Sequence, residues 1–204
     1  GNDALMAIPP TLTDLPKQAQ FDYFSAIAEA TALPLIIQDA SAYVGQVIPL
    51  EVLVKLLEKY GSNKILFKPE AEPLGPNLSA LRDATNFQAK IFEGSGGIML
   101  IDSFRRGITG TMPGMDLLDG IIEVWHALQA DNHERAYEVY FPICALIALQ
   151  MQAGLDGLLA IEKYLLVKRG LFTTAKRRKP HKWELDKETQ AEADRLFAML
   201  QDCL

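Results

Sequence analysis

Short apolar segments alternate with longer amphipathic segments through the first half of the chain. Five of the short segments have the length of strands and no polar alternation: 4–9, 33–39, 64–68, 89–94 and 107–112. Continuous apolar runs are typical of parallel strands that are covered on both faces. The segments between them have the apolar spacing of helices: 17–31, 49–60, 78–85 and 98–106. This order predicts right-handed β-α-β crossovers and a parallel sheet.

The pattern changes after Gly114, where the strand signals stop. The rest of the sequence has four helical segments: 115–130, 133–151, 155–169 and 187–201. The α/β part fits either an open doubly wound sheet or a (β/α)8 barrel. A barrel usually needs about 250 residues and eight strands. The strand count alone therefore favours an open sheet.

Composition and charge exclude several kinds of function. The 204 residues contain 20 Lys and Arg against 26 Asp and Glu, and this formal charge of -6 disfavours binding to nucleic acid or to an acidic membrane surface. The basic segment 167–182 has the opposite charge and is interpreted as a solvated loop. Cys144 and Cys203 are too few for a disulfide framework or a thiolate metal site, and the histidines lack zinc-ligand spacing.

The sequence has no motif for a cofactor, for secretion or for a membrane span. Neither a P-loop nor a complete dinucleotide-binding motif is present, so we expect no nucleotide cofactor and no metal. No signal-peptide pattern opens the chain, and no uninterrupted apolar run approaches about 18 residues. We therefore expect a soluble, cytoplasmic protein without a nucleic-acid or membrane partner.

Four segments, taken in order, carry a resemblance to a known family. They are "LPLIIQDASAYVG" (33–45), "ILFKPEAE" (65–72), "KIFEGSGG" (90–97) and "GITGTMPG" (107–114). Their order and spacing resemble the dihydrodipicolinate synthase and N-acetylneuraminate lyase family of class I aldolases and dehydratases. The resemblance covers residues 1 to about 170. It implies a TIM barrel in which these segments are strands five to eight, and "GNDALMAIPP" is the turn into strand four.

The resemblance therefore implies an α/β chain that holds about the last five βα units of a (β/α)8 barrel. Residues 1–114 would form strands four to eight, and residues 115–204 would form the last barrel helix and a C-terminal helical region. Without the first strands the barrel cannot close, and strand edges would be exposed. We therefore expect that the sequence is a fragment, that residues precede Gly1, or that another chain supplies the missing strands.

Lys68 is the predicted catalytic nucleophile. The resemblance implies that this lysine of the sixth strand attacks the ketone of pyruvate or another 2-oxo acid and forms an imine. Its position allows the role, because it follows the apolar run 65–67 and burial disfavours the charged ammonium form. Barrel active sites are built at the carboxyl ends of the strands. The structural alternative is a lysine that reaches solvent or pairs with Glu70 or Glu72.

Further site residues are expected at the ends of the neighbouring strands. The predicted substrate-binding residues are Gln38, Asp39, Glu93, Gly94, Gly110, Thr111 and Met112. The glycine-rich turns 94–97 and 110–114 can bring backbone N–H groups close to an anionic ligand. Tight turns also need glycine for conformation alone, so both interpretations of these turns stay open.

Two departures from the family pattern affect the predicted chemistry. The family usually has a proton-relaying tyrosine near the end of strand five, where this chain has Gln38. An amide is not a useful acid or base near neutral pH. Tyr43 is the nearest phenol and is our second catalytic candidate. It also stands where the synthases carry an arginine that binds a substrate carboxylate, so a sugar-derived 2-oxo acid is favoured over the lysine-biosynthetic reaction.

Three functional hypotheses follow. The first is a Schiff-base lyase, either an aldolase or a dehydratase, that acts on a small 2-oxo acid and forms a homo-oligomer (dimer or tetramer). The second is a non-catalytic or truncated barrel that serves as a binding or oligomerisation module. The third is a phosphate-recognising barrel, suggested by the two glycine turns.

Overall fold

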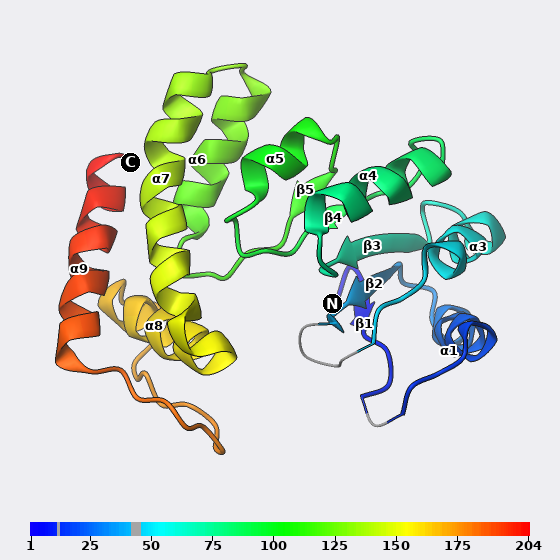
Figure 1. Cartoon of the computed structure of the whole chain (residues 1–204), viewed down its shortest axis with the longest axis horizontal. Helices are drawn as coiled ribbons and strands as arrows, with labels where there is room; N and C mark the ends of the chain where they lie inside the picture. The colour runs from blue at the N-terminus through cyan, green and yellow to red at the C-terminus, as the bar shows by residue number, and fades with distance from the viewer. Residues whose placement is uncertain (12, 42–45) are drawn as a thin grey trace. The chain divides into compact units, whose positions relative to one another are not determined.

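The structure is a computed structural model that describes residues 1–11, 13–41 and 46–204. It divides into two compact units. The α/β unit contains residues 1–95 and 99–112, and the helical unit contains residues 96–98 and 113–204. Each unit is described separately below (Figure 1).

Five parallel strands form the centre of the α/β unit. They are β1 (Leu5–Ala7), β2 (Leu35–Asp39), β3 (Ile65–Pro69), β4 (Phe92–Glu93) and β5 (Gly110–Thr111). Strands β1, β2 and β3 pair in that order, and β4 pairs with β5. A parallel bridge between Phe67 and Ile91 connects the middle of β3 to the segment before β4. The parallel strands predicted from the apolar runs are confirmed, although β4 and β5 are shorter than predicted.

Strand alternation gives the sheet two different faces. In β2 the side chains of Leu35, Ile37 and Asp39 are buried, with at most 4% exposed, whereas Gln38 is half-buried. Successive side chains of a strand point to opposite faces. The register places Gln38 directly beside Lys68 of β3. These two polar side chains therefore share a face that Asp39 does not.

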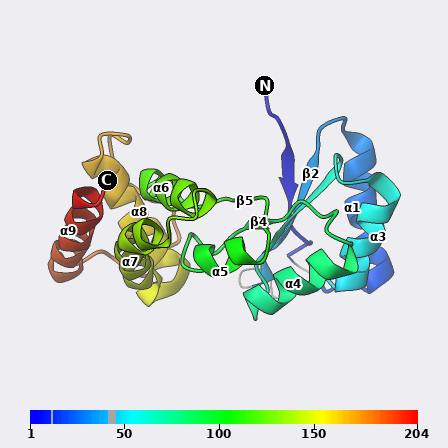
Figure 2. The same ribbon diagram turned by 90° about the horizontal axis from the view of Figure 1, so that it is seen from above.

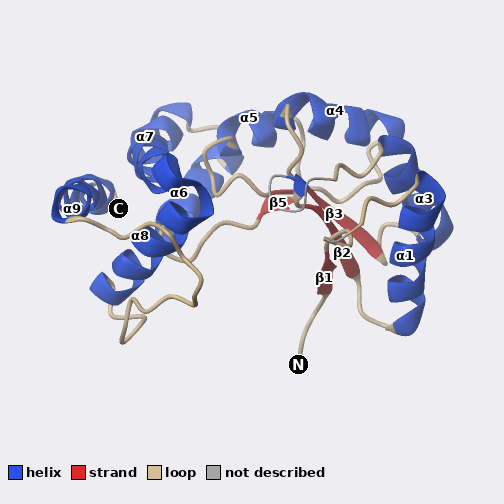
Figure 3. Cartoon of the chain, turned by 60° about the horizontal axis from the view of Figure 1, so that its bottom comes forward, coloured by secondary structure: helices blue, strands red, loops and turns tan. Residues whose placement is uncertain are grey.

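Helices cover one side of this sheet (Figures 2 and 3). They are α1 (Lys17–Ala30), α3 (Leu50–Tyr60), α4 (Leu74–Ala84) and α5 (Leu100–Arg105). α1 packs against α3, and α3 packs against α4. Fully buried side chains such as Phe24 and Leu56 form the core between helices and strands. Burial of apolar area of this kind supplies most of the driving force for folding.

α4 begins four residues earlier than predicted from the apolar spacing. It starts at Leu74 rather than residue 78, with Pro73 at the position before the helix. Pro76 lies in its first turn, where backbone N–H groups have no intrahelical partner. The prolines that obscured the pattern in the sequence are therefore compatible with a helix start.

The second unit is made of helices: α6 (Leu118–Gln129), α7 (His133–Gln150), the short 3-10 helix η1 (Met151–Ala153), α8 (Gly154–Lys168) and α9 (Lys187–Asp202). α7 packs against α6, α8 and α9. Its side chains Val139, Ile143 and Leu146 are completely buried. Asp186 caps the start of α9 by accepting a hydrogen bond from the N–H of Thr189 at 2.7 Å.

Residues 133–168 are long and apolar enough, by length and composition alone, to cross a membrane. In the structure this segment is two helices, α7 and α8, separated by η1, and α8 begins at Gly154, which has a φ of 56°. A positive φ interrupts an α-helix and favours glycine. The packing of α7 on three neighbouring elements gives the apolar side chains of this segment a role in the core of the unit.

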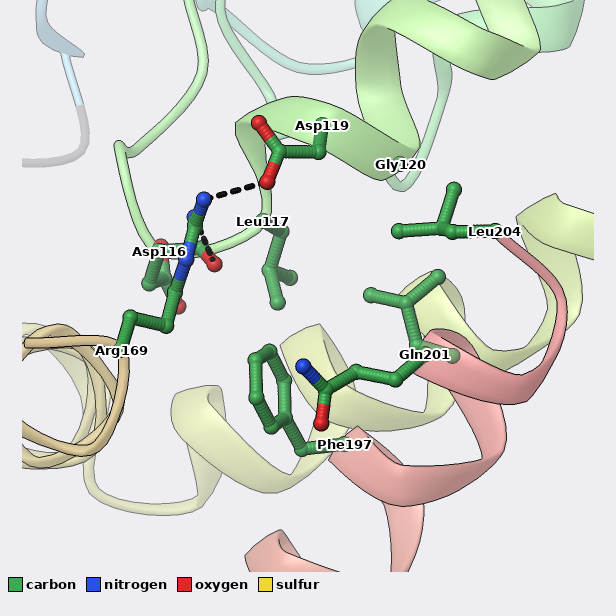
Figure 4. A pocket seen from close by; sticks show the side chains of 9 residues that line it. Asp116, Leu117, Asp119, Gly120, Arg169, Phe197, Gln201 and Leu204 are labelled. Atoms are coloured by element: carbon green, nitrogen blue, oxygen red, sulfur yellow. Dashed lines mark hydrogen bonds and ion pairs between the residues drawn. The ribbon is translucent and has the colours of Figure 1, made fainter.

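The basic segment 167–182 is a largely exposed loop, as predicted from its charge. Arg177 holds this loop in place. The Arg177 guanidinium donates hydrogen bonds to the carbonyl oxygens of Asp156 and Trp183 and to the carboxylate of Glu184. Arg169 binds the Asp119 carboxylate beside a small cavity of the helical unit (Figure 4). That cavity, of about 30 Å³, has room for little more than one water molecule.

Asp116 is a buried carboxyl group in the helical unit. Gln150 donates a hydrogen bond to its Oδ2 at 2.5 Å. A Cβ atom at Gly114 would lie 2.8 Å from Asp116 Oδ1 and 2.9 Å from Glu162 Oε1, so the two carboxyl groups approach the same point. Burial and the nearby charge of Glu162 raise the pKa of Asp116 from 3.8 to about 6.

We predict that this carboxyl group makes the helical unit less stable as the pH rises. A raised pKa means that, between pH 3.8 and about pH 6, the folded state keeps a proton that the unfolded state has released. The stabilisation of the folded state by this proton is complete below pH 3.8 and is lost as the pH rises through about 6. Relative to Asp116→Asn, the wild-type free energy of unfolding should fall by on the order of 2 kcal/mol between pH 4 and pH 7. Urea unfolding followed by tryptophan fluorescence measures this, because both tryptophans, Trp125 and Trp183, lie in the helical unit.

The matched control is Asp202→Asn, which removes an exposed carboxylate from the same unit. It should follow the wild-type pH dependence. Parallel wild-type and Asp116→Asn curves across this pH range would contradict the prediction.

Candidate active site

Lys68 lies near the carboxyl end of β3 and is buried. Only 8% of the residue is exposed, although it carries an ammonium group. Its Nζ lies 2.7 Å from Glu70 Oε1, and the side chains of both residues are about one-tenth exposed. The predicted buried position of Lys68 is thus observed together with the predicted alternative, an ion pair with Glu70.

Glu70 connects Lys68 to the neighbouring strand. Its Oε1 accepts a hydrogen bond from Lys68 Nζ at 2.7 Å and another from Gln38 Nε2 at 3.0 Å. Its Oε2 is buried and has no hydrogen-bond partner among the described residues. Buried carboxylate oxygens without a partner are rare in proteins and require an explanation.

Sequence reasoning considered Glu70 only as a partner for Lys68 and not as a site residue. The signal was present in the spacing, because residues two apart in an extended segment point to the same face. Lys68 and Glu70 therefore face one way, and the register adds Gln38 across from Lys68. We call Lys68, Glu70 and Gln38 the lysine triad.

The lysine triad is suited to proton transfer. An ammonium and a carboxylate at 2.7 Å can exchange a proton directly, which leaves a neutral amine with a free lone pair. Because removing one partner from a buried ion pair leaves an uncompensated charge, the two groups depend on one another. The arrangement can thus hold a lysine in a dry environment and also deprotonate it.

Gly94 gives the triad its space at the end of β4. A Cβ atom at this position would lie 2.6 Å from Glu70 Oε1 and 3.0 Å from Lys68 Cε. Both distances are shorter than an ordinary van der Waals contact. A larger residue at this position would therefore have to displace the side chain of Glu70 or Lys68.

Glu93 is fully buried and joins β4 to β5. Its Oε2 accepts a hydrogen bond from the Thr111 hydroxyl at 2.8 Å, and its Oε1 accepts one from the Ser95 N–H at 2.5 Å. Its carbonyl oxygen accepts from the Met112 N–H at 2.9 Å. Gly110 pairs with Phe92, whose ring would be 3.0 Å from a Cβ at residue 110. These contacts define a second polar cluster, and the substrate-binding role of its residues stays a prediction.

Asp39 lies apart from the triad, on the opposite face of β2. Its Oδ1 accepts from the Ser41 N–H at 3.0 Å, and its Oδ2 accepts from the Ile48 N–H at 3.2 Å. Burial raises the pKa of Asp39, the hydrogen bonds from Ile48 and Ser41 oppose the rise, and the charge of Glu70 adds to it. The carboxylate lines a cavity of about 190 Å³ together with side chains such as Leu53 and Leu81. The structure therefore does not bring Asp39 together with Lys68.

Tyr43, the second catalytic candidate, lies outside the described residues. Among the residues that are described, no three His, Cys, Asp or Glu side chains gather in a way that could hold a metal ion. The described polar groups at this end of the sheet are therefore the lysine triad and the Glu93 cluster.

We predict that Gly94→Ala displaces Glu70. The added methyl group should lower the free energy of unfolding by about 1–3 kcal/mol, as overpacking of a filled site usually does. The same substitution in a Glu70→Ala background should lose most of this effect, because the side chain nearest to the new methyl group is gone. Urea unfolding of the four proteins measures the coupling. Equal effects of Gly94→Ala in both backgrounds would show that Glu70 does not occupy this place.

Comparison with known proteins gives a consistent result. No protein-family profile matches the chain. The chain is 27% identical over 198 residues to L-2-keto-3-deoxyarabonate dehydratase of Azospirillum brasilense. This alignment covers 94% of the chain and 62% of the dehydratase. It thus spans less than two thirds of this relative's length.

Solved structures extend the likeness to the fold. A dihydrodipicolinate synthase from Rhodopseudomonas palustris has a TM-score of 0.84 at 26% identity, over 97% of this chain and 66% of that one. A Ruminococcus gnavus sialic acid aldolase has a TM-score of 0.83 at 19% identity, over 100% of this chain and 66% of that one. The chain thus has the fold of about the last five βα units of the TIM barrel found in these enzymes, with a C-terminal helical region, and its sequence is similar to those of the dehydratase and the dihydrodipicolinate synthase.

Proposed function

We propose that the protein is a Schiff-base-forming lyase in which Lys68 condenses with a 2-oxo acid. The observation that carries the proposal is the buried Lys68 Nζ at the carboxyl end of a parallel strand, 2.7 Å from a carboxylate. That end of the strands is where TIM-barrel enzymes build their active sites. The likeness to a dehydratase and to an aldolase adds support.

The proposed chemistry starts with the amine of Lys68. Its ammonium loses a proton, and the neutral nitrogen attacks the keto carbon and forms an N–C bond. The former carbonyl oxygen leaves as water, so that an ammonium and a ketone become a protonated imine and water. The cationic imine then draws electrons from the adjacent carbon. In a dehydration, a C–H bond of that carbon breaks and the hydroxyl of the next carbon leaves as water after it gains a proton. In an aldol cleavage, the hydroxyl of the next carbon loses its proton and the C–C bond between the two carbons breaks, which releases an aldehyde. Burial of the site prevents premature hydrolysis of the imine.

A sugar-derived 2-oxo acid is the proposed substrate class. The relative from Azospirillum brasilense is named for dehydration of L-2-keto-3-deoxyarabonate. This chain also lacks the arginine that the synthases use for an aldehyde substrate, because Tyr43 stands in its place. A charge-assisted hydrogen bond of that kind contributes roughly 1.5–3 kcal/mol, so its loss argues against the lysine-biosynthetic substrate. Dehydration and aldol cleavage both remain compatible with a Lys68 imine.

A non-catalytic binding module is less well supported. A module without chemistry has no need to bury Lys68 and Glu70, since buried ion pairs contribute little to stability.

The proposal also includes a homo-oligomer, either a dimer or a tetramer, in the cytoplasm. Large apolar side chains exposed on the helical unit, among them Phe141 at 63% exposure, support a contact with another copy.

We predict that sodium borohydride in the presence of pyruvate attaches a reduced pyruvate adduct to Lys68. Peptide mass analysis should find the adduct on the tryptic fragment that contains residue 68 and nowhere else at comparable yield. Lys68→Arg should abolish it, because a guanidinium is not a nucleophile near neutral pH. Lys64→Arg, at the other end of the same segment, is the matched control and should react normally. Wild-type protein that folds but remains unmodified would refute the Schiff-base mechanism.

We predict that L-2-keto-3-deoxyarabonate is consumed by dehydration. Product analysis by NMR should then show loss of water with the carbon chain intact. Formation of pyruvate together with an aldehyde would assign the protein as an aldolase instead. No consumption of this compound, alongside a normal pyruvate adduct, would exclude it as the substrate and leave the imine mechanism in place.

A further inference from the structure

Gln38 occupies the place where the resemblance implies a proton-relaying tyrosine. An amide cannot carry a proton through a catalytic cycle, because it neither gains nor loses one near neutral pH. If the proposed Schiff-base function is correct, another group must move protons at Lys68. The contacts of Gln38 indicate which group this is.

Gln38 and Lys68 bind the same atom. Gln38 Nε2 donates to Glu70 Oε1 at 3.0 Å, and Lys68 Nζ donates to that oxygen at 2.7 Å. The β2–β3 register, which places Gln38 opposite Lys68, makes this convergence possible. One carboxylate oxygen is therefore fixed by two donors from two adjacent strands.

The other oxygen of Glu70 has no hydrogen-bond partner in the part of the chain that the structure describes. Oε2 is buried, and no described residue gives it a hydrogen bond. A buried carboxylate oxygen beside a nucleophile can accept a hydrogen bond from a ligand or from a water molecule. With Oε1 held by Gln38, the carboxylate cannot rotate to satisfy Oε2 without losing that hydrogen bond.

We propose that Glu70 is the proton relay of the Lys68 site and that Gln38 positions it. This proposal rests on the proposed function. Glu70 takes a proton from the Lys68 ammonium and leaves a neutral amine. After the amine has attacked the ketone, the nitrogen passes one of its protons to the former carbonyl oxygen. Glu70 then returns the proton that it took to the same oxygen, which leaves as water. Glu70 thus begins and ends as a carboxylate, and the protons balance without any other reactant.

The same carboxylate can act in the next step. A base must remove a proton from the carbon beside the imine, and Glu70 is within hydrogen-bond distance of the nitrogen to which that carbon becomes linked. Gln38 favours this activity because its N–H holds Oε1 of the carboxylate beside Lys68 Nζ. Glu70 is accordingly a catalytic residue, and Gln38 is a positioning residue that acts through it.

The experiment measures exchange of the pyruvate methyl protons for deuterium by NMR, as a function of pH. This exchange requires both the imine and a base, and it needs no knowledge of the natural substrate. Glu70→Gln should slow exchange by at least about 100-fold, the usual contribution of general acid–base catalysis. Glu72→Gln removes an exposed carboxylate two residues away and should exchange like wild type.

Gln38→Leu tests the positioning role. Loss of its N–H should slow exchange by about 10-fold, because Glu70 Oε1 loses one of the two donors that hold it in place. In the Glu70→Gln background, Gln38→Leu should have no further effect on exchange. Glu70→Asp, which keeps the charge but shortens the side chain, should give intermediate exchange and replaces Glu70→Gln if that variant does not fold.

Two outcomes separate this proposal from the proposed function. Absence of any borohydride-trapped adduct in the wild-type protein would contradict both the Schiff-base function and the proton relay that depends on it. A normal adduct and normal exchange in Glu70→Gln, or an equal effect of Gln38→Leu in both backgrounds, would overturn the relay alone.

Discussion

The buried pair of Lys68 and Glu70 is the interaction on which the candidate site depends. Two opposite charges, each with only about one-tenth of its side chain exposed, are held 2.7 Å apart at the end of β3. Removing one partner of such a pair typically lowers the free energy of unfolding by about 3–5 kcal/mol, because the remaining charge is buried without a partner. The pair also fits the proposed reaction, since the ammonium and the protonated imine carry the same charge. Glu70 would therefore face a cation both before the reaction and in the protonated imine.

The surrounding structure explains how that pair can exist. Parallel register brings Gln38 to Lys68 and allows its amide to bind Glu70. Gly94 leaves the space that any other residue would fill. The opposite face of the same strands is packed against helices, and this packing holds the backbone in place. A polar site on one face thus depends on an apolar core on the other.

Much of the fold was predictable because its signals are local. The apolar runs identified the parallel strands, and the helical spacing identified every helix segment of the α/β unit that is described here, with α4 displaced at its start by Pro73 and Pro76. Lys68 was identified from its place after an apolar run and from the family resemblance. These features depend on residues that are close together in the sequence.

The missed parts of the site depend on contacts between strands. Glu70 was not recognised as more than a partner because the contact with Gln38, 32 residues away, is set by strand register. Asp39 was grouped with Gln38 by sequence proximity, although adjacent residues in a strand face opposite ways. An alternation rule applied to residues 38–39 and 68–70 would have separated Asp39 from the site and included Glu70.

The most direct test of the account is a crystal structure of the protein soaked with pyruvate. The proposed mechanism predicts continuous electron density between Lys68 Nζ and the keto carbon of pyruvate. Glu70 Oε1 should still be hydrogen-bonded to Gln38 and lie within hydrogen-bond distance of the imine nitrogen. An unmodified Lys68 that keeps its ion pair with Glu70 while pyruvate is bound elsewhere would contradict it.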